Sequence, residues 1–328
     1  MAVAICIFAA FLGSISGSAT ACLAIIGTIF VPMMADSGYS RAFAAGLAVT
    51  SAGLGAVIPP SVFMIVFGAS NRVSVADLFA AGVGPGLLAA FLMCLTSIWI
   101  SKKRGYQSGV RATFAQRVES FKKAFPIILM PLIVLGGIYS GIFSPTQAAS
   151  VACAYSLFLG VVIWKVFMDA LVETVRLSSM IYFLVIGGDL FGRVLGYVGL
   201  PQMICEWVIG MELGPVTFLF AVQGLLLVMG FFFSSFPMVV IVLPLFLPSV
   251  NALGIDPALY GALAVFCSII GEVTPPMGPQ LWIAAPICKV KIGLIMREAW
   301  LFLGVQVLTL ALVTLFPQIS LFLVEAMR

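Results

Sequence analysis

The sequence of 328 residues contains no histidine, and only 9% of its residues are charged, whereas a soluble globular protein carries about 25% charged residues. Without histidine the chain cannot build a Ser–His nucleophile, and it lacks the commonest proton relay and metal ligand of proteins. Its seven cysteines form no Cys-x-x-Cys motif, so we interpret them as small core residues. The chain is therefore not expected to be an enzyme, and no bound cofactor is expected.

What the sequence does contain is apolar, with 62% hydrophobic residues arranged in long runs. These runs do not alternate with period two, as the strands of an outer-membrane barrel would. The composition predicts an all-α polytopic membrane protein embedded in a lipid bilayer. No nucleic acid partner is expected, because the basic residues cluster at the predicted membrane edges. Full spans are predicted at 78–101, 124–143, 146–168, 179–199 and 298–322.

The remaining apolar segments are short or interrupted. Residues 1–12 would reach about 18 Å as a helix, against roughly 30 Å of hydrocarbon, and residues 20–34 are also short. We therefore expect residues 1–34 to form a re-entrant hairpin. The interrupted segments are 41–69, broken by Gly53-Leu-Gly-Ala-Val-Ile-Pro-Pro-Ser61, 215–250, broken by Phe233-Ser-Ser-Phe-Pro237, and 258–287, broken by Gly271-Glu-Val-Thr-Pro-Pro-Met-Gly-Pro279. We expect 215–250 to be a second hairpin, and 41–69 and 258–287 to be broken helices.

The charges predict the orientation in the membrane. Residues 102–123 hold seven Lys/Arg and a single acid, so the positive-inside rule places this loop in the cytoplasm. Counting crossings from there, the first hairpin enters from the cytoplasm and the second from the opposite side. The C-terminus is then expected on the periplasmic side. A second basic cluster, Lys289, Lys291 and Arg297, falls on the cytoplasmic side by the same count. Because this cluster was not used to assign the orientation, it is an independent check of it.

The two interrupted regions match each other in spacing. Pro32 precedes Pro59-Pro60 by 27 residues, and Pro248 precedes Pro275-Pro276 by the same 27. At the corresponding offset of 216, Ser18 falls on Ser234. Since the copies enter from opposite sides, the pattern predicts an inverted repeat, which is typical of secondary transporters. The predicted parts are a first repeat over 1–101, a basic loop over 102–123, connecting and scaffold helices over 124–199, and a second repeat over 200–322.

The interruptions have a chemical interpretation. Backbone that leaves the helix inside a bilayer must be satisfied by protein, water or a ligand. The tip Ser14-Ile-Ser-Gly-Ser18 offers carbonyls that suit a small cation and a helix N-terminus that suits an anion. Pro-Pro stops a helix and frees carbonyls upstream. Glycine, serine and proline also serve as packing and kink residues in membrane helices, but the matched spacing favours a central site for an anionic solute with sodium ions.

Asp189, Arg193 and Glu272 fall inside predicted membrane segments, where charge is costly and faces a cavity or a partner. Asp189 and Arg193 are four residues apart on one helix face. They either neutralise each other, or Arg193 contributes to the path of an anionic substrate. Glu272 lies within the second broken segment, where a carboxylate could bind a cation or a proton, or shape the choice of substrate.

Several motifs resemble those of one family, from end to end of the chain. They are Ile15-Ser-Gly-Ser-Ala-Thr-Ala21, Arg41-Ala-Phe-Ala-Ala-Gly-Leu47, Ile58-Pro-Pro-Ser61, Gly141-Ile-Phe-Ser-Pro-Thr-Gln-Ala-Ala-Ser-Val151, Leu253-Gly-Ile-Asp-Pro257 and Val273-Thr-Pro-Pro-Met-Gly278. The family is the large membrane subunit of tripartite ATP-independent periplasmic (TRAP) transporters. The resemblance implies an elevator-type ion transporter fold in the bacterial inner membrane and sodium-driven uptake of an organic acid such as a C4-dicarboxylate or sialic acid. It also implies two partners, a small four-helix membrane subunit and a periplasmic substrate-binding protein.

The resemblance also implies roles for residues at the tips and breaks. One sodium site would use Ser16, Gly17, Gly53, Gly55 and Ile58, and the other would use Ser234, Ser235, Gly271 and Thr274. The solute would meet Ser18, Thr20 and Ser234, together with Arg193 and Glu272, and the helix-breaking residues would be Pro59, Pro60, Pro275 and Pro276.

The sequence departs from the family pattern in three ways. Members usually carry further transmembrane segments before the first hairpin, so the resemblance is to a subunit that lacks its N-terminal helices. The second tip reads Ser234-Ser-Phe-Pro237, where Asp-Gly is more usual, and Glu272 stands where an apolar or small polar residue is more usual. Two alternatives stay open, a truncated remnant that does not transport, and a sodium–dicarboxylate symporter of the same superfamily that needs no binding protein.

Overall fold

The structure is a computed structural model that describes residues 1–106, 113–159 and 164–328, with the backbone alone for residues 164–166. Within these ranges every regular element is a helix, and seven helices are long and apolar enough to cross a membrane. This confirms the prediction of an all-helical polytopic membrane protein. Arg111 of the predicted basic loop and residues 160–163 of the predicted span 146–168 lie outside the described residues.

The helices form two compact units. Unit 1 comprises Met1–Gln107 and Gly188–Arg328, and unit 2 comprises Ser108–Gly187. Unit 2 contains α7 (Phe114–Tyr139), α8 (Pro145–Leu159) and the beginning of α9 (Trp164–Val198). Within it α7 and α8 lie side by side, and the Tyr155 hydroxyl donates to the carbonyl of Pro126 at 2.7 Å.

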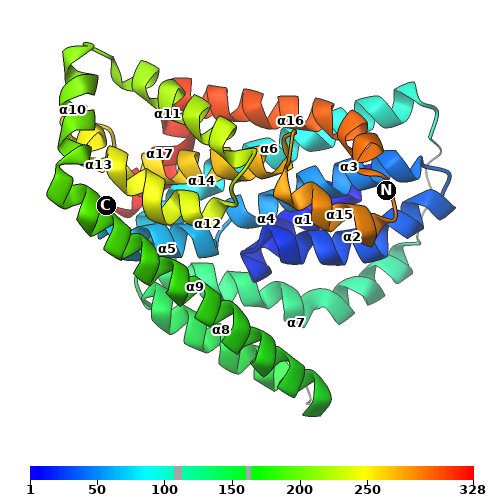
Figure 1. Ribbon diagram of the computed structural model, residues 1–328. Helices are drawn as coiled ribbons and strands as arrows, with labels where there is room; N and C mark the ends of the chain where they lie inside the picture. The colour runs from blue at the N-terminus through cyan, green and yellow to red at the C-terminus, as the bar shows by residue number, and fades with distance from the viewer. Residues whose placement is uncertain (107–112, 160–163) are drawn as a thin grey trace. The chain divides into compact units, whose positions relative to one another are not determined.

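The first half of unit 1 begins with a pair of helices and continues into an interrupted one (Figure 1). Its elements are α1 (Ala2–Ser16), α2 (Ala19–Asp36), α3 (Arg41–Ala52), α4 (Leu54–Val57), α5 (Val62–Asn71) and α6 (Val75–Lys103). The chain turns between α1 and α2 at Gly17, whose φ of 62° is left-handed and favours glycine. Between α4 and α5 it is extended at Ile58 and passes through Pro59-Pro60, since proline cannot continue the helical hydrogen bonding.

The second half of unit 1 follows α10 (Leu200–Gly210) and has the same order of elements. They are α11 (Pro215–Gly230), α12 (Ser235–Pro237), the π-helical turn η1 (Met238–Val242), α13 (Leu243–Ala252), α14 (Pro257–Val273), α15 (Pro279–Cys288) and α16 (Ile292–Leu315). Both Pro-Pro peptide bonds, Pro59-Pro60 and Pro275-Pro276, are cis.

The bounds of the two halves correspond at an almost constant offset. The helical run from Ala19 to Asp36 matches the run from Ser235 to Ala252, and the segment from Arg41 to Val57 matches α14, each at the offset of 216 found in the sequence. After the Pro-Pro motifs the offset is 217, because the second half carries one more residue there, and Val75 at the start of α6 matches Ile292 at the start of α16. From each tip to the start of the long helix, the helices thus begin and end where the sequence repeat places them, whereas the bounds of α1 and α11 and the ends of α6 and α16 do not match at these offsets.

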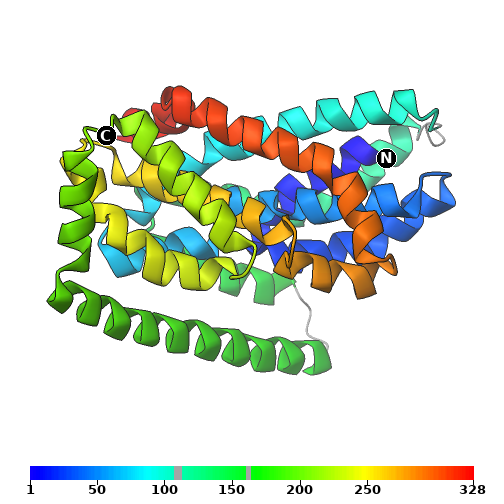
Figure 2. The same ribbon diagram turned by 45° about the horizontal axis from the view of Figure 1, so that its top comes forward.

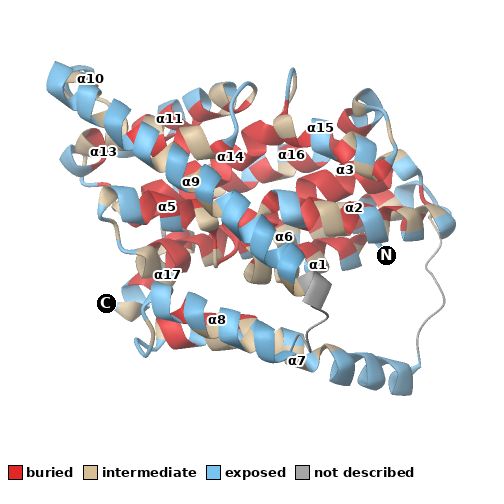
Figure 3. Cartoon of the chain, turned by 60° about the horizontal axis from the view of Figure 1, so that its bottom comes forward, coloured by how far each residue is buried: buried red, intermediate tan, exposed pale blue. Residues whose placement is uncertain are grey.

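The broken helices occupy the core of unit 1. Figure 3 shows the buried residues gathered on α3, α14 and their neighbours, and every residue of α14 from Ala258 to Val273 is buried. Each broken helix also packs on the long helix of the other half, α3 on α16 and α14 on α6. The Gln306 amide of α16 donates to the Thr50 carbonyl at 2.9 Å, close to the point where α3 ends. The two halves therefore share one core.

Apart from the hairpin tips and the helix breaks, the loops of unit 1 gather at two opposite ends (Figures 1 and 2). At one end Arg104 pairs with Glu298 at 2.7 Å, and the Arg41 Nε donates to the Cys288 carbonyl at 3.0 Å. At the other end the guanidinium of Arg328 lies 3.2 Å from Asp77 and 3.1 Å from Asp256. The segments that the sequence places on the cytoplasmic side therefore share one end. Which end faces the cytoplasm stays a prediction.

Several predicted spans have different bounds in the structure, among them 124–143, because α7 already begins at Phe114, within the predicted loop 102–123. The segment predicted as one final helix over 298–322 is divided into α16 and α17 (Gln318–Met327). Pro317 causes the division, since it has no N–H for the preceding turn and disfavours helical backbone at Phe316, whose ψ is 75°. The predicted span 179–199 is the C-terminal part of the longer helix α9.

Candidate functional site

Each hairpin packs on the broken helix of its own half through a pair of glycines. In the first half Gly13 of α1 lies against the backbone of Gly55, and in the second half a Cβ on Gly230 would lie 2.6 Å from the Cα of Gly271. A side chain at Gly13, Gly230 or Gly271 would meet backbone, which cannot move aside, and one at Gly55 would first meet the Cys22 side chain. The contacts hold both hairpin tips next to the points where the helices break, and they occupy corresponding places in the two halves.

The first tip is built from small hydroxyl residues. The Ser18 side chain caps α2 by accepting from the Ala21 N–H, and Ser16 Oγ is 3.2 Å from Cys22 Sγ in a hydrogen bond. The Gly17 carbonyl accepts from the Val62 N–H at 3.4 Å, which joins the tip directly to the helix after the break. Thr20 is exposed and Ser18 is half-buried, so these two predicted solute contacts face away from the packed core.

The first break exposes backbone oxygens inside a buried environment. Gly53, Gly55 and Ile58 are all buried. Because Pro59 and Pro60 have no N–H groups, the carbonyls four residues before them lose their helical partners. The structure therefore places Ser16 and Gly17 next to the break that contains Gly55 and Ile58. The resemblance implies that these residues share one sodium site, and that role stays a prediction.

A carboxylate from the neighbouring broken helix, Glu272 of α14, binds the second tip. Glu272 is only 5% exposed, and its Oε1 accepts from the Ser235 N–H at the start of the helix that follows the tip. Its Oε2 accepts from Gln280 Nε2 at 3.0 Å, beyond the Pro-Pro motif. One side chain on α14 thus joins the hairpin to both halves of the broken helix.

Several oxygens near the second break lack partners. Ser235 Oγ and Gln280 Oε1 are buried and make no hydrogen bond among the described residues. The Thr274 hydroxyl donates to the Ile270 carbonyl at 2.7 Å, and its N–H donates to the Gly271 carbonyl at 2.9 Å. Hydroxyl, carbonyl and carboxylate oxygens suit a hard cation, so this donor set fits sodium. In the described part of the chain no group of three or more His, Cys, Asp or Glu residues could hold a metal.

Not every predicted site residue joins these clusters. Arg193 Nε lies 3.0 Å from the Asp189 carboxylate, and both side chains are exposed. The pair therefore neutralises itself, the first of the two interpretations of its spacing, and the contribution of Arg193 to the substrate path stays a prediction. Ser234 is exposed at the tip, where it precedes α12 without a capping hydrogen bond from its side chain.

Gln280 was not predicted as a site residue. Its amide binds Glu272 although the two are eight residues apart across the Pro-Pro motif. A polar side chain directly after the helix-starting Pro279, in an otherwise apolar helix, is the signal that could have identified it.

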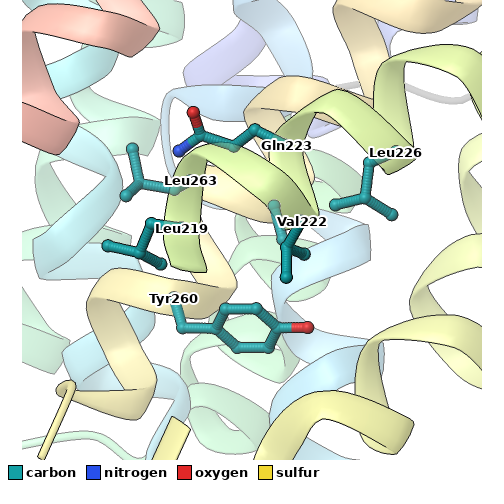
Figure 4. A pocket seen from close by; sticks show the side chains of 7 residues that line it. Leu219, Val222, Gln223, Leu226, Tyr260 and Leu263 are labelled. Carbon is teal, nitrogen blue, oxygen red and sulfur yellow. The ribbon is translucent and has the colours of Figure 1, made fainter. Parts of the chain in front are cut away.

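A small pocket between α11 and α14 does not serve as a solute site (Figure 4). It is lined mainly by Leu219, Val222, Leu226 and Leu263 and has no room for a water molecule. Its two polar side chains are engaged, since Gln223 donates to Thr314 Oγ1 at 2.7 Å and the Tyr260 hydroxyl donates to the Leu243 carbonyl at 3.0 Å. Near the second tip, by contrast, Ser235 Oγ and Gln280 Oε1 are buried without a hydrogen-bond partner.

Comparison with known proteins agrees with the resemblance seen in the motifs. The family model described as "Tripartite ATP-independent periplasmic transporter, DctM component" matches residues 1–319. The sialic acid TRAP transporter large permease protein SiaM of Vibrio cholerae is 35% identical over 315 residues, which cover 94% of this chain and 74% of that protein. The C4-dicarboxylate TRAP transporter large permease protein DctM of Pseudomonas aeruginosa is 34% identical, with 98% and 76% covered.

A third relative is named for a different solute. The ectoine TRAP transporter large permease protein TeaC of Halomonas elongata is 32% identical, over 95% of this chain and 74% of that protein. All three relatives are named as permeases rather than enzymes. By the family model and by these relatives, the chain belongs to the DctM family of large membrane components of tripartite ATP-independent periplasmic transporters.

Proposed function

We propose that this chain is the transport subunit of a sodium-driven secondary transporter that imports an organic acid anion. The observation that carries the proposal is the paired construction of unit 1, in which each hairpin tip is held against a broken helix by a glycine contact. Broken helices that meet near the middle of a membrane supply carbonyls for sodium and helix N-termini for an anion. Membership of the DctM family supports the same function.

In this proposal the basic segment 102–123 faces the cytoplasm and the C-terminus faces the periplasm of a bacterial inner membrane. The first hairpin, α1 and α2, then enters from the cytoplasm, and the second, α11 to α13, enters from the periplasm. Support comes from the two ends of unit 1, because Arg104, Glu298 and Cys288 share one end and Asp77, Asp256 and Arg328 share the other. In an inverted repeat the corresponding loops of the two halves lie at opposite ends of the unit, as these residues do.

The proposed roles follow the contacts at each tip. One sodium ion binds near Ser16, Gly17 and the carbonyls of the first break, and a second binds near Ser235 and the carbonyls of the second break. The solute lies between the tips, where Ser18, Thr20 and Ser234 have exposed or half-buried hydroxyls. Unit 1 then carries solute and ions across the membrane as a rigid body, the elevator mechanism, and its shared core of broken helices supports such a movement.

Two partners complete the proposal. A periplasmic binding protein delivers the solute, and a small four-helix membrane subunit completes the transporter. The term "large permease protein" in the names of the relatives supports the second partner. A symporter that works without a binding protein is the alternative within the superfamily, and a remnant without transport activity is the other.

Uptake into proteoliposomes tests the proposal. The chain is reconstituted with a small membrane subunit and a binding protein of a tripartite transporter, and labelled organic acids are offered with and without an inward sodium gradient. We expect uptake only with the gradient, and we expect Ser235→Ala to lower it, because Ser235 supplies an unpartnered buried hydroxyl. Ser37→Ala is the matched control, since Ser37 caps its own helix at an end of unit 1.

Each other outcome has a distinct meaning. Uptake without the binding protein favours the independent symporter, and uptake driven equally by any cation contradicts the sodium proposal. No uptake of any acid under any gradient favours the remnant.

A further inference from the structure

Two long helices of unit 1, α6 and α16, pack side by side and form a shallow apolar groove. Its volume is about 300 Å³, and it is lined by Leu95, Thr96 and Trp99 of α6 and by Leu301 and Val305 of α16. The side chains of Leu95, Trp99 and Leu301 are about half exposed. Both helices are long and apolar enough to cross a membrane. The groove therefore offers van der Waals contacts to a hydrocarbon chain that lies along the two helices.

The helix faces that line the groove also carry cations, all at the same end. On α6, Lys102 and Lys103 follow Trp99 by three and four residues. On α16, Arg297 precedes Leu301 by four residues. Residues three or four apart lie on one helix face, and four residues of a helix span about 6 Å. The positive charges thus stand about one helical turn beyond the end of the groove.

These cations are available to a ligand. Lys102, Lys103 and Arg297 are exposed and take part in none of the ion pairs found among the described residues. The acid next to Arg297 in the sequence, Glu298, pairs with Arg104 at 2.7 Å. The Lys103 ammonium lies 4.9 Å from the centre of the Trp99 ring, a combination typical of the membrane interface.

An apolar groove that ends in unpaired cations has the chemical profile of an anionic phospholipid, with an acyl chain below and a phosphate above. A helix of another protein fits less well. Helix interfaces inside membranes favour small residues that let backbones approach closely, whereas this groove is lined by large ones such as Trp99 and Leu301. A partner helix would also have to bring acids to match three cations.

We propose that this groove is a binding site for one anionic phospholipid. An acyl chain lies along Leu95, Trp99 and Leu301, and the headgroup phosphate lies beside Lys103 and Arg297. The site is separate from the hairpin tips, so the proposal goes beyond the proposed function and does not depend on it. Each cation near an anionic lipid contributes roughly fivefold in affinity, and we expect an anionic lipid to bind at least about tenfold more tightly than a zwitterionic one.

Native mass spectrometry of the chain in detergent micelles tests the proposal, because it counts bound lipid molecules. The probes are phosphatidylglycerol and phosphatidylcholine with identical oleoyl chains, and glycerol 3-phosphate as a headgroup without chains. We expect one phosphatidylglycerol to bind at a concentration at least about tenfold lower than phosphatidylcholine. Glycerol 3-phosphate should not bind, since it has no chain to fill the groove.

Two variants separate the parts of the site. Replacing Lys102, Lys103 and Arg297 together by glutamine should lower the affinity for phosphatidylglycerol at least about tenfold and leave phosphatidylcholine unchanged. Leu301→Trp keeps all three cations and fills the groove. Because each buried CH₂ contributes roughly fourfold in affinity, this variant should also lose at least about tenfold.

The matched control removes three exposed cations from unit 2. Replacing Arg117, Lys122 and Arg176 together by glutamine makes the same change in net charge and should alter the affinity for phosphatidylglycerol by no more than about twofold. Equal losses in this control and in the variant of Lys102, Lys103 and Arg297 would mean diffuse attraction to the whole chain, and would overturn the proposal.

Four other results would also overturn it. They are equal binding of the two lipids, no binding of phosphatidylglycerol, unchanged affinity in Leu301→Trp, and binding of glycerol 3-phosphate as tight as that of the lipid. Release of the bound lipid when a small membrane subunit is added would show that a protein covers the groove instead. Sodium-driven uptake of an acid is a separate measurement, and its outcome bears on the proposed function and not on this site.

Discussion

The two halves of unit 1 share a backbone plan but differ in how the hairpin tip is held. In the first half, backbone groups hold it, with the Gly17 carbonyl accepting from the Val62 N–H and Gly13 lying on Gly55. In the second half a buried carboxylate, Glu272, is added to the glycine contact. The same fold can therefore fix a hairpin tip with or without a charged side chain, so the Glu272 carboxylate is not required by the fold itself.

The tips also differ in the residues that they expose. The first tip, Ser14–Ser18, is made of serine, isoleucine and glycine, whereas the second exposes Phe232 and Phe233 before Ser234. The helix after the tip is continuous in the first half, but in the second it contains the π-helical turn η1. Turns of this kind are frequent at functional sites. The second half is thus the specialised one, and its differences are concentrated where solute and ions are proposed to bind.

The largest effect is expected from disrupting what the halves share. Gly230→Val places a branched side chain against the backbone of Gly271, where a Cβ alone would lie 2.6 Å from the Cα. Overpacking that cannot relax costs about 3 kcal/mol or more, so we expect a large fall in the unfolding temperature and loss of uptake. Gly13→Val should do the same in the first half.

Gly224→Val is the control for this change. Gly224 lies on the same helix, α11, with nothing within 4 Å of the added Cβ, so its stability should change by only about 0.5 kcal/mol. Equal losses at Gly13 and Gly230 would support equivalent roles for the two contacts. Tolerance of Gly13→Val would show that only the second tip depends on close packing.

A smaller effect is expected from converting the second half to the apolar pattern of the first. Glu272→Ala leaves the Ser235 N–H and the Gln280 amide buried without partners, at a cost of about 2 kcal/mol. Adding Gln280→Leu removes one of these groups and should recover about 1 kcal/mol, since the two residues contact each other. Thermal unfolding of both single variants and the double variant measures this coupling, and strict additivity would show that the contact contributes nothing.

The backbone plan could be predicted from the sequence because its causes are local. Pro59-Pro60 and Pro275-Pro276 stop helices by their own chemistry, and Gly17 allows the turn that the structure contains. Pro317 carried the same kind of signal, but the apolar residues around it suggested a continuous span. The spacing of Asp189 and Arg193 predicted a pair, because four residues bring two side chains onto one helix face.

The contact between Glu272 and Gln280 could not be predicted in this way. It depends on how the two halves of a broken helix are oriented after the chain leaves the helix at Thr274, and no periodic pattern continues across such a break. The sequence marked Glu272 as an unusual charge, but only the structure shows that both of its oxygens are engaged by the protein. That engagement makes Glu272 the link between the second hairpin and both parts of its broken helix.

The smallest effects are expected where the halves are joined at their ends. Arg104 of α6 pairs with Glu298 of α16, whose side chain is 15% exposed, and the guanidinium also lies over the Phe43 ring at 5.3 Å. Arg328 pairs with Asp77 of the first half and Asp256 of the second, but its own side chain is 56% exposed. Exposed pairs contribute about 0.5 kcal/mol or less and are screened by salt, whereas a half-buried pair with a cation–π contact contributes about 1 kcal/mol.

We therefore expect Arg104→Ala to lower the unfolding temperature more than Arg328→Ala, and the effect of Arg328→Ala to shrink further in high salt. Unfolding scans of both variants at low and high sodium chloride make the comparison. Lys289→Ala, which removes an exposed cation with no ion pair among the described residues, corrects for the change in net charge. A larger loss for Arg328→Ala than for Arg104→Ala would mean that the halves are joined chiefly at the proposed periplasmic end, where Arg328 contacts both of them.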